Sequence, residues 1–225
     1  MKILSIGSDR NLFQSASAVR ERVIGYANQV DEMHVIVFTK KSLTFTATQI
    51  SPKLWIYPTN SSSKLFYIFD AVKLAKKLKF KFDLVTCQDP FESGLTGWLI
   101  ARNLSAKLEL QIHTDIGNRY FQHESLKNKI RYFLAKRLLP KADKIRVVSD
   151  RIKMYLINEL KIDRLKIEVR PIFINVDKIK NAPITVDLHK KYPQFDKIIL
   201  MASRLTREKN IDLAIKAMPT ILKTL

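Results

Sequence analysis

The sequence predicts an α/β fold in which a parallel sheet carries helices on both faces. Short runs rich in β-branched residues alternate along the 225-residue chain with longer segments whose apolar residues have helical spacing. Such alternation is typical of parallel sheets, because each helix carries the chain back to the end where the next strand begins. The apolar content of 46% is enough for a hydrophobic core. The sequence has no period of about 20 to 50 residues that would indicate a repeat protein.

The predicted strands are short and are spread over the whole chain. They are Lys2–Ile6, Met33–Phe38, Asp83–Thr86, Lys107–Ile112, Lys144–Val148, Lys166–Val169 and Lys197–Met201. Residues 42–57 contain two further extended runs, LTFTATQI and KLWIY. We expect these two runs to be shorter strands near an edge of the sheet.

The predicted helices have apolar residues three and four positions apart. One such stripe is formed by Ala16, Val19, Val23, Ala27 and Val30. A second stripe lies between residues 65 and 78, and a third lies between residues 126 and 138. Each stripe predicts a helix that packs one side on the sheet.

The rhythm of strands and helices stops between residues 178 and 195. This segment contains Pro183, Pro193, mixed charges and no sustained period, which is typical of a boundary segment. We therefore predict a Rossmann-like domain at residues 1–180 and a linker at residues 181–196. Residues 197–225 are predicted to be the first strand and helix of a second, truncated Rossmann-like domain.

The chain is strongly basic, with 40 Lys and Arg residues against 21 Asp and Glu residues and a formal net charge of +19. Such a charge attracts polyanions, which include nucleic acid, anionic lipid headgroups and phosphorylated substrates. Codon usage that favours lysine and isoleucine is the alternative cause of the same charge.

The sequence also favours a cytoplasmic location. The only cysteine, Cys87, excludes an internal disulfide and indicates a reducing compartment. The apolar run at the N-terminus ends at Gly7, which is too short for the core of a signal peptide. Every later apolar run is interrupted by Lys or Arg before it reaches the length of a membrane span.

Polar residues follow several predicted strands at the point where each strand ends. In open parallel sheets, ligands bind beyond the carboxyl ends of the strands, so these residues are the candidates for a binding site. They are Gly7 and Ser8, Gln88 and Asp89, His113 and Thr114, and Ser149.

The segment RLTREKNIDLAIKAM, residues 204–218, has the features of a phosphate-binding turn that opens a helix. Arg204 offers a planar pair of donors for two phosphate oxygens, and Lys209 supplies a compact positive charge five residues later. Two fixed cations and the amide end of a helix stabilise the charge of a departing diphosphate without a metal ion. A solvated helix start with scattered charges is the alternative interpretation.

Several segments occur in the order seen in the retaining glycosyltransferases of family 4, and the chain resembles these enzymes over residues 1–225. The segments are VTCQDPFESGLTGWLIAR, LQIHTD, ADKIRVVSDRIKMYLINELKID, KIEVRPIFINVD and ASRLTREKNIDLAIKAM. The resemblance implies the GT-B architecture, in which two Rossmann-like domains face each other across a cleft. It also implies transfer of a sugar from a nucleotide-sugar donor to a glycan or lipid-linked acceptor, with retention of configuration and without a metal or other cofactor.

The same resemblance assigns roles to individual residues. It places His113 near the transferred sugar as the catalytic contact, and it places Arg204 and Lys209 on the donor diphosphate. Gln88 and Asp89, with the other residues of the strand ends, become candidate contacts to the acceptor or the cleft. A glycosidase with paired carboxylates at Asp89 and Glu92 has no support beyond their proximity in sequence.

The chain departs from the family pattern in two places. The glycine pair that commonly follows the first strand is replaced by GSDRNLF, so we expect an acceptor loop of a different shape. The paired glutamates of the family's second domain have no counterpart within 225 residues. We therefore expect this chain alone to be inactive and to retain at most weak binding of the acceptor.

The basic residues are concentrated in two predicted helices. Lys73, Lys76 and Lys77 share one helical face, and residues 127–141 interleave Lys and Arg with aromatic and aliphatic residues. Both segments are typical of surface helices that contact anionic lipid, which suits a peripheral position at the inner face of the cell membrane. The solvated outer face of a crossover helix is the alternative.

Two other functions remain as alternatives. A GT-B protein of different chemistry, such as a nucleotide-sugar epimerase or an inverting transferase, would share most of the motifs. A basic nucleic-acid-binding protein would share the charge, but the sequence contains no recognition helix or aromatic groove motif, so no nucleic-acid partner is expected.

Overall fold

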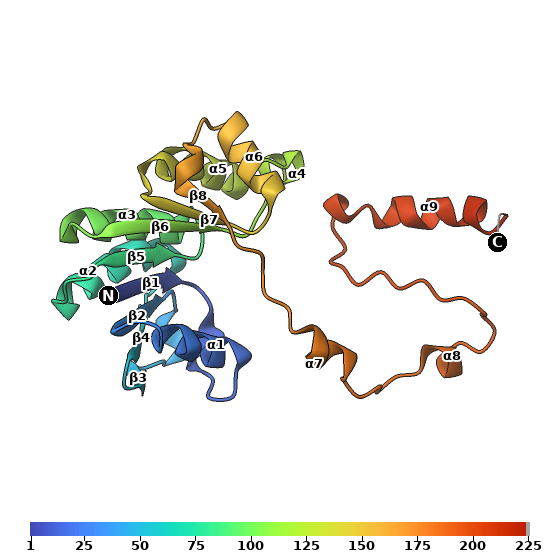
Figure 1. Cartoon of the computed structure of the whole chain (residues 1–225), viewed down its shortest axis with the longest axis horizontal. Helices are drawn as coiled ribbons and strands as arrows, with labels where there is room; N and C mark the ends of the chain where they lie inside the picture. The colour runs from blue at the N-terminus through green and yellow to red at the C-terminus, as the bar shows by residue number, and fades with distance from the viewer. Residues whose placement is uncertain (224–225) are drawn as a thin grey trace. The chain divides into compact units, whose positions relative to one another are not determined.

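The computed structural model describes residues 1–223, and its first unit, Met1–Pro171, is built on an eight-stranded sheet (Figure 1). The strand order is β3-β4-β2-β1-β5-β6-β7-β8, and every neighbouring pair is parallel except β3 and β4. The strands are β1 (Lys2–Gly7), β2 (Glu32–Val37), β3 (Thr48–Ser51), β4 (Leu54–Pro58), β5 (Leu84–Cys87), β6 (Lys107–Ile112), β7 (Lys144–Val147) and β8 (Ile167–Val169). The predicted α/β fold is confirmed, including the extra strands near one edge.

The helices divide unevenly between the two faces of this sheet. The helix α1 (Ala18–Ala27) packs on one face near β2 and β4. The other face is covered by α2 (Tyr67–Leu78), α3 (Glu92–Leu104), α5 (Leu126–Leu138) and α6 (Asp150–Asn158), and the short α4 (Arg119–His123) precedes α5 (Figure 1). Helices therefore cover both faces as predicted, and among the described residues of this unit α1 is the α-helix on one side.

Each face of the sheet has its own hydrophobic cluster. The smaller cluster lies under α1 and contains Leu12, Val23, Ala27, Met33, Val35, Val37, Leu54 and Ile56. The larger cluster joins the inner sides of α2, α3, α5 and α6 to the alternate residues of the central strands, such as Leu4, Ile6, Leu110 and Ile145. Because successive residues of a strand point to opposite faces, β2 contributes Val35 and Val37 to the smaller cluster and Ile36 to the larger one.

Serine side chains fix where several helices begin. The Oγ atoms of Ser17, Ser125 and Ser149 accept hydrogen bonds from backbone N–H groups in the first turns of α1, α5 and α6. Such caps satisfy donors that a helix start leaves unpaired. At the other end, Lys79 after α2 and Ser105 after α3 adopt the left-handed conformation and turn the chain toward the next strand.

The helix α3 lies unusually close to β5 because it contains glycine where it crosses the strand. A β-carbon at Gly97 would lie 2.1 Å from Cys87 Sγ. Another at Gly94 would lie 2.9 Å from the carbonyl oxygen of Asp89. The glycines thereby bring the start of α3 against the carboxyl end of β5, where the candidate residues Gln88 and Asp89 lie.

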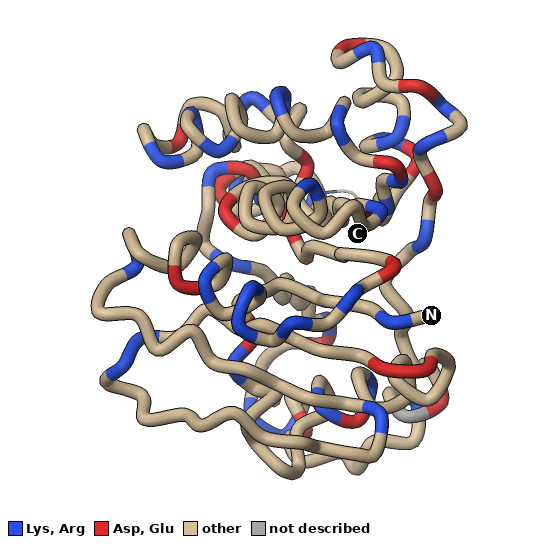
Figure 2. The backbone as a smooth tube through the Cα atoms, turned by 90° about the vertical axis from the view of Figure 1, so that its left-hand side faces the viewer, with Lys and Arg blue, Asp and Glu red and all other residues tan. Residues whose placement is uncertain are grey.

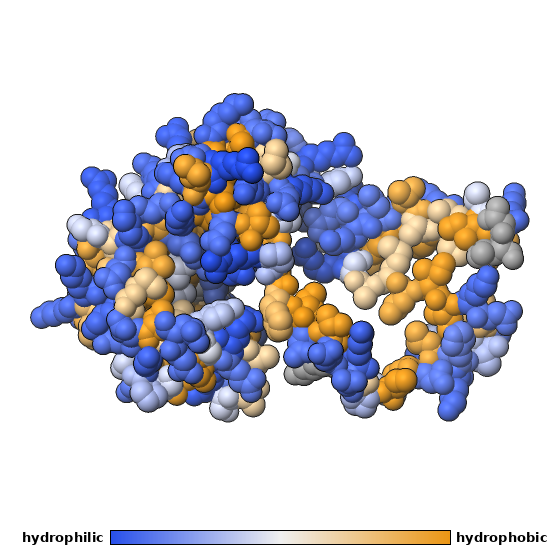
Figure 3. Space-filling model, viewed as in Figure 1, coloured by the Kyte–Doolittle hydropathy of each residue, from blue (hydrophilic) through white to orange (hydrophobic). Residues whose placement is uncertain are grey.

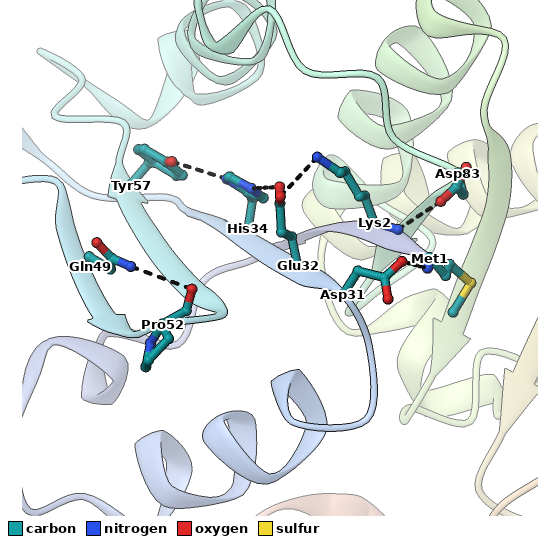
Figure 4. A network of polar contacts seen from close by, with 9 residues as sticks. All are labelled: Met1, Lys2, Asp31, Glu32, His34, Gln49, Pro52, Tyr57 and Asp83. Carbon is teal, nitrogen blue, oxygen red and sulfur yellow. Dashed lines mark hydrogen bonds and ion pairs between the residues drawn. The ribbon is translucent and has the colours of Figure 1, made fainter.

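His34 on β2 is a buried polar residue surrounded by aromatic rings. Figure 4 shows its imidazole between the side chains of Tyr57 and Glu32. Its ring is stacked on Trp55 at a centroid distance of 4.8 Å, and Phe80 and Phe82 close the other sides. Its Nδ1 lies 3.0 Å from the hydroxyl of Tyr57, and its Nε2 lies 3.5 Å from a Glu32 carboxylate oxygen. Burial lowers the pKa of His34, although Glu32 opposes this effect.

The second unit, Ile172–Leu225, has little of this organisation. Its described elements are α7 (Val176–Lys180), α8 (Leu188–Lys191), the 3₁₀ turn η6 (Arg207–Lys209) and α9 (Ile211–Ile221). None of the side chains described in it is buried, and large apolar residues such as Phe173, Leu200 and Leu213 are exposed (Figure 3). The unit therefore has no hydrophobic core within the described residues.

The predicted strand at Lys197–Met201 is wrong for this structure. Residues 197–202 have no strand conformation, and within the described residues no strand is paired with them. A strand needs a neighbour to accept and donate its backbone hydrogen bonds, so an apolar run without one stays irregular. The predicted domain limits at 180 and 197 stay a prediction, and residues 224 and 225 lie outside the described residues.

Candidate functional site

The candidate residues of the first unit lie at the carboxyl ends of β1, β5, β6 and β7, which are neighbours in the sheet. Gln88 follows β5, and its side chain lies over Gly7 at the end of β1. A β-carbon at Gly7 would lie 2.1 Å from Gln88 Oε1, so only glycine leaves room for this arrangement. The backbone N–H of Gln88 donates to the Ile6 carbonyl at 3.0 Å, which extends the β1–β5 pairing to this point.

His113 follows β6 and is held by a hydrogen-bonded chain on the sheet. Its Nε2 lies 3.2 Å from Gln111 Oε1, and the same oxygen lies 3.3 Å from Arg146 Nη1 on β7. Because a guanidinium can only donate, the Gln111 oxygen is an acceptor and His113 Nε2 must donate to it. The Nδ1 atom of a neutral His113 is then an acceptor, and no hydrogen bond within the described residues involves it.

Desolvation and nearby positive charge favour this neutral form of His113. Desolvation by the surrounding residues lowers the pKa of the imidazole, and the positive charge of Arg146 lowers it further. The negative charge of Asp89 raises the pKa of His113, but by less than burial and Arg146 lower it. A neutral imidazole with a free acceptor atom can receive a hydrogen bond from a hydroxyl group.

Asp89 begins the turn that leads from β5 into α3. Its Oδ1 accepts a hydrogen bond from the Phe91 N–H at 2.8 Å, and its backbone N–H donates to Ser93 Oγ at 3.1 Å. Burial raises the pKa of the Asp89 carboxyl in spite of these bonds. Glu92 is engaged elsewhere, since both of its carboxylate oxygens lie 3.0 Å from Arg131 Nε. The structure therefore does not bring Asp89 and Glu92 together as a catalytic pair.

The remaining candidates of the first unit have different surroundings. Ser149 is committed to its capping bond with the Ile152 N–H at 3.4 Å, so its hydroxyl has a structural role. Ser8 and Thr114 are exposed, and no side-chain hydrogen bond is formed by either within the described residues. Asp115, two residues after His113, forms an ion pair with Arg151 of α6.

Arg204 and Lys209 lie in the second unit, on the turn that precedes α9. The structure brings both cations to one carboxylate, since Glu208 Oε1 lies 3.2 Å from Arg204 Nη2 and 4.0 Å from Lys209 Nζ. The Arg204 side chain is 80% exposed. An exposed ion pair of this kind contributes little to stability, so a bound anion can replace the carboxylate at small cost.

Sequence reasoning missed Gln111 and Arg146, the two residues that orient His113. The signal was present in the run Glu109, Gln111, His113, whose period of two places polar residues on one face of a strand. Arg146 joins them because β6 and β7 pair with Gln111 opposite Arg146. Its Nε is buried and has no hydrogen-bond partner among the described residues.

No cluster of three or more His, Cys, Asp or Glu side chains within residues 1–223 is arranged to hold a metal ion. The expectation of a reaction without metal or cofactor stays a prediction. Among the described helices, none has the length and apolar character needed to span a membrane.

Comparison with known proteins relates this site to one family. The model of Glycosyltransferase Family 4 matches residues 18–178, which is more than half of the chain and includes β2 to β8 of the sheet. No curated protein gives a significant match in sequence.

Solved structures show the same fold at low sequence identity. Sucrose-phosphate synthase from Thermosynechococcus elongatus matches with a TM-score of 0.68 and 20% identity, covering 98% of this chain and 60% of that protein. HepE from Anabaena, solved in complex with UDP and glucose, matches with a TM-score of 0.63 and 16% identity, covering 97% and 57%. UDP-GlcNAc 2-epimerase from Neisseria meningitidis, bound to UDP-GlcNAc, has a TM-score of 0.51 and 16% identity, covering 88% and 55%.

The chain thus spans little more than half the length of these three structures. This likeness confirms the GT-B-type, Rossmann-like fold predicted from the sequence. The family match over residues 18–178 confirms the predicted relationship to the family.

Proposed function

The chain belongs to Glycosyltransferase Family 4, and on this basis we propose that it serves in the transfer of a sugar from a nucleotide-sugar donor to a glycan or lipid-linked acceptor with retention of configuration. The observation that carries the proposal is the family match over residues 18–178, which includes the strand ends that hold Gln88, Asp89 and His113.

The donor would be held through its diphosphate by Arg204 and Lys209. Both cations pair with one carboxylate oxygen of Glu208, which supports the proposal that together they can hold an anionic oxygen of a ligand. As the bond to the sugar breaks, negative charge grows on the diphosphate, and two cations stabilise that charge more strongly than they stabilise the intact donor. HepE was solved with UDP and glucose, which makes a nucleotide-sugar the natural donor class to test.

The first unit would supply contacts to the sugar and the acceptor. His113 would accept a hydrogen bond from a sugar hydroxyl at Nδ1, because its Nε2 donates to Gln111. Gln88 and Asp89 would contact the acceptor, with Gly7, Ser8 and Thr114 beside them. The raised pKa of Asp89 suits a group that exchanges a proton with an acceptor hydroxyl.

The alternative is a GT-B protein of other chemistry. A nucleotide-sugar epimerase shares the fold, as the Neisseria structure illustrates, and an inverting transferase would use a similar donor. A basic nucleic-acid-binding protein remains a weaker alternative that rests on the net charge of +19 alone. Product analysis separates these possibilities, because only a transferase attaches the sugar to a new acceptor.

Binding of nucleoside diphosphates by calorimetry tests the donor site, using UDP, GDP and ADP with the protein that contains these 225 residues. We expect Arg204→Ala and Lys209→Ala each to weaken the preferred ligand about 10- to 100-fold, because each removes a charge-assisted hydrogen bond. Lys216→Ala is the matched control, since Lys216 is an exposed cation of α9 paired with Asp212. Equal losses in all three variants would contradict the assigned site.

Transfer is tested by incubating labelled nucleotide-sugars and membrane extract with a protein that carries these 225 residues together with a complete donor domain, since the 225 residues alone are expected to be inactive. Label that appears in a lipid or glycan fraction, with an anomeric configuration by NMR equal to that of the donor, is the expected result. His113→Ala should lower transfer by about 100-fold or more if the imidazole acts at the sugar. A free epimerised nucleotide-sugar as the only product would identify the epimerase alternative instead.

A further inference from the structure

The outer side of α2 carries an unusual combination of exposed apolar and basic residues. With 3.6 residues per turn, Phe69, Lys73 and Lys76 fall on one arc of α2, opposite Tyr67, Ala71 and Ala75, which are buried in the core. Leu65 lies in the 3₁₀ turn η3 (Lys64–Phe66) that leads into this helix. Leu65 is 83% exposed and Phe69 is 71% exposed. The side chains of Leu65 and Phe69 are therefore not buried by the fold of the first unit and add little to its hydrophobic core.

The lysines of this arc, and Lys77 and Lys79 beside it, have no counter-charge among the described residues. Within the described residues, no Asp or Glu oxygen lies within ion-pair distance of Lys73, Lys76, Lys77 or Lys79. These four lysines line a shallow groove of about 480 Å³ whose other walls are Phe69 and Val72. Unpaired ammonium groups around apolar side chains fit a partner that offers negative charge above an apolar layer.

The outer side of α5 repeats the pattern. Leu126, Ile130 and Phe133 fall on one arc and are 74%, 54% and 56% exposed. Lys129, Lys136 and Arg137 lie along the same arc, and the guanidinium of Arg137 lies 4.8 Å from the ring centroid of Phe133. The inner side of α5 is anchored by Ala135 and Leu138, which are buried.

The two arcs belong to one layer of the molecule. The helix α3 contacts α2 on one side and α5 on the other, and all three pack on the same face of the sheet. Between the arcs lies Trp98 of α3, with Arg102 and Lys141 over its ring at 5.8 Å and 4.8 Å. These three helices contain nine Lys and Arg residues and two acidic residues, and Figure 2 shows the charged positions along the chain.

From these observations we propose that the outer side of the α2–α3–α5 layer binds the surface of an anionic bilayer. The lysines and arginines contact lipid phosphates and acidic headgroups, while Leu65, Phe69, Ile130 and Phe133 enter the boundary between headgroups and acyl chains. The proposal goes beyond the sugar-transfer function and is independent of it. A nucleic acid would match the charge but would leave the four apolar side chains exposed to water.

Vesicle sedimentation tests the proposal with the full chain. Vesicles of phosphatidylcholine with about one third phosphatidylglycerol should bind the protein at low salt, whereas vesicles of phosphatidylcholine alone should not. The triple variant Lys73→Gln, Lys76→Gln, Lys77→Gln should bind the anionic vesicles about 10- to 100-fold more weakly. The variant Phe69→Ser, Phe133→Ser should also bind the anionic vesicles more weakly. Both side chains are exposed, so their replacement should leave the fold intact and remove only the contact with the membrane.

A control variant with the same net charge distinguishes binding through the α2–α3–α5 surface from binding that depends only on the net charge of the protein. The variant Arg22→Gln, Lys53→Gln, Lys144→Gln removes the same number of positive charges from the other face of the sheet. Arg22 belongs to α1, and Lys53 contacts the Val30 carbonyl just after α1. Lys144 is on the α1 face of β7. It should bind anionic vesicles nearly as well as the parent protein. An equal loss in this control, or equal binding to neutral vesicles, overturns the proposal.

Two further measurements address depth and the rival partner. The variant Phe69→Trp should be quenched by brominated lipid in anionic vesicles more strongly than the parent protein, whose Trp55 is stacked on His34 and whose Trp98 lies between the two arcs. A DNA oligonucleotide that binds more tightly than the vesicles, with no effect of the two serine substitutions, would assign the surface to nucleic acid instead. Nucleoside diphosphate binding should be unchanged in all of these variants, which separates this proposal from the donor site.

Discussion

The side-chain carboxamide of Gln88 occupies the space that a β-carbon at Gly7 would fill, since such an atom would lie 2.1 Å from Gln88 Oε1. Gly7 ends β1 and Gln88 follows β5, so the contact joins the ends of the two strands at the centre of the sheet. The missing side chain at position 7 therefore sets the position of a candidate acceptor contact.

We predict that Gly7→Ala displaces Gln88 at a modest cost in stability. The clash involves the end of a flexible side chain, so the free energy of unfolding should fall by about 1 kcal/mol. In a protein that already carries Gln88→Ala, adding Gly7→Ala should lower the free energy of unfolding much less than it does in the parent protein. Urea unfolding of the two single variants and the double variant measures this difference. A full and additive loss in the double variant would show that Gln88 is not the obstacle.

His34 should make stability depend on pH in the weakly acidic range. Its pKa in the folded protein is lowered by burial, while in the unfolded chain it has the ordinary value of about 6.5. The unfolded chain therefore takes up the proton first as the pH falls below about 6.5, and the free energy of unfolding decreases; above this pH, His34 contributes no slope.

Urea unfolding between pH 5 and pH 7.5 measures this slope. The variant His34→Phe keeps a ring against Trp55 but cannot ionise, so its slope should be smaller than that of the parent protein. His123→Ala serves as the control, because His123 is an exposed histidine of α4. An unchanged slope in His34→Phe would place the pH dependence on other groups.

Cys87 should be inert in the folded protein. It is fully buried, and burial raises the pKa of its thiol well above the ordinary value, so little thiolate is present. A thiol reagent should label it only after urea unfolding. Rapid labelling under native conditions would indicate that α3 opens away from β5.

The close packing beside Cys87 gives a related prediction. Gly97→Ala should destabilise the protein by about 1 to 3 kcal/mol, because the added methyl group would lie 2.1 Å from Cys87 Sγ. Gly25→Ala on α1 is the matched control, since nothing lies within 4 Å of a β-carbon there. The control should be neutral or slightly stabilising in the same unfolding assay.

Limited proteolysis should separate the two units. Residues 172–223 contain no buried side chain among those described, and their exposed apolar residues offer cleavage sites. Chymotrypsin should cut after Phe173 or Phe195 before it cuts within residues 1–171. The shortened chain of residues 1–171 should unfold cooperatively in urea with nearly the same midpoint as the full chain; a broad transition would show that the second unit supports the first.

The strands and helices of the first unit could be predicted because their signals are local. The alternation of residues 107–112 and the apolar stripe of residues 65–78 each indicate one element, and both elements are present within a residue or two of the predicted limits. The run at residues 197–201 carries the same local signal, but strand formation depends on a neighbour, which local sequence does not supply.

The side chains of the candidate site could also be predicted only where their signal is local. His113 was found because it follows a predicted strand and matches a family motif, whereas its partners depend on which strand lies next to β6 and in which register. Gln111 and Arg146 meet only because residues 35 positions apart pair across β6 and β7. Such a pairing is a property of the assembled sheet.

The order of strands has a consequence for synthesis on the ribosome. The strands β1, β2, β3 and β4, with α1 and the smaller hydrophobic cluster, all lie within the first 58 residues, so this half-sheet can assemble as soon as it emerges. The free edge of β1 and the apolar side chains of Leu4 and Ile6 then wait for β5, which is complete only at Cys87. At about 5 to 20 residues per second, this leaves an open sheet edge for a few seconds, and a nascent chain in that interval is the form most exposed to aggregation and to chaperones.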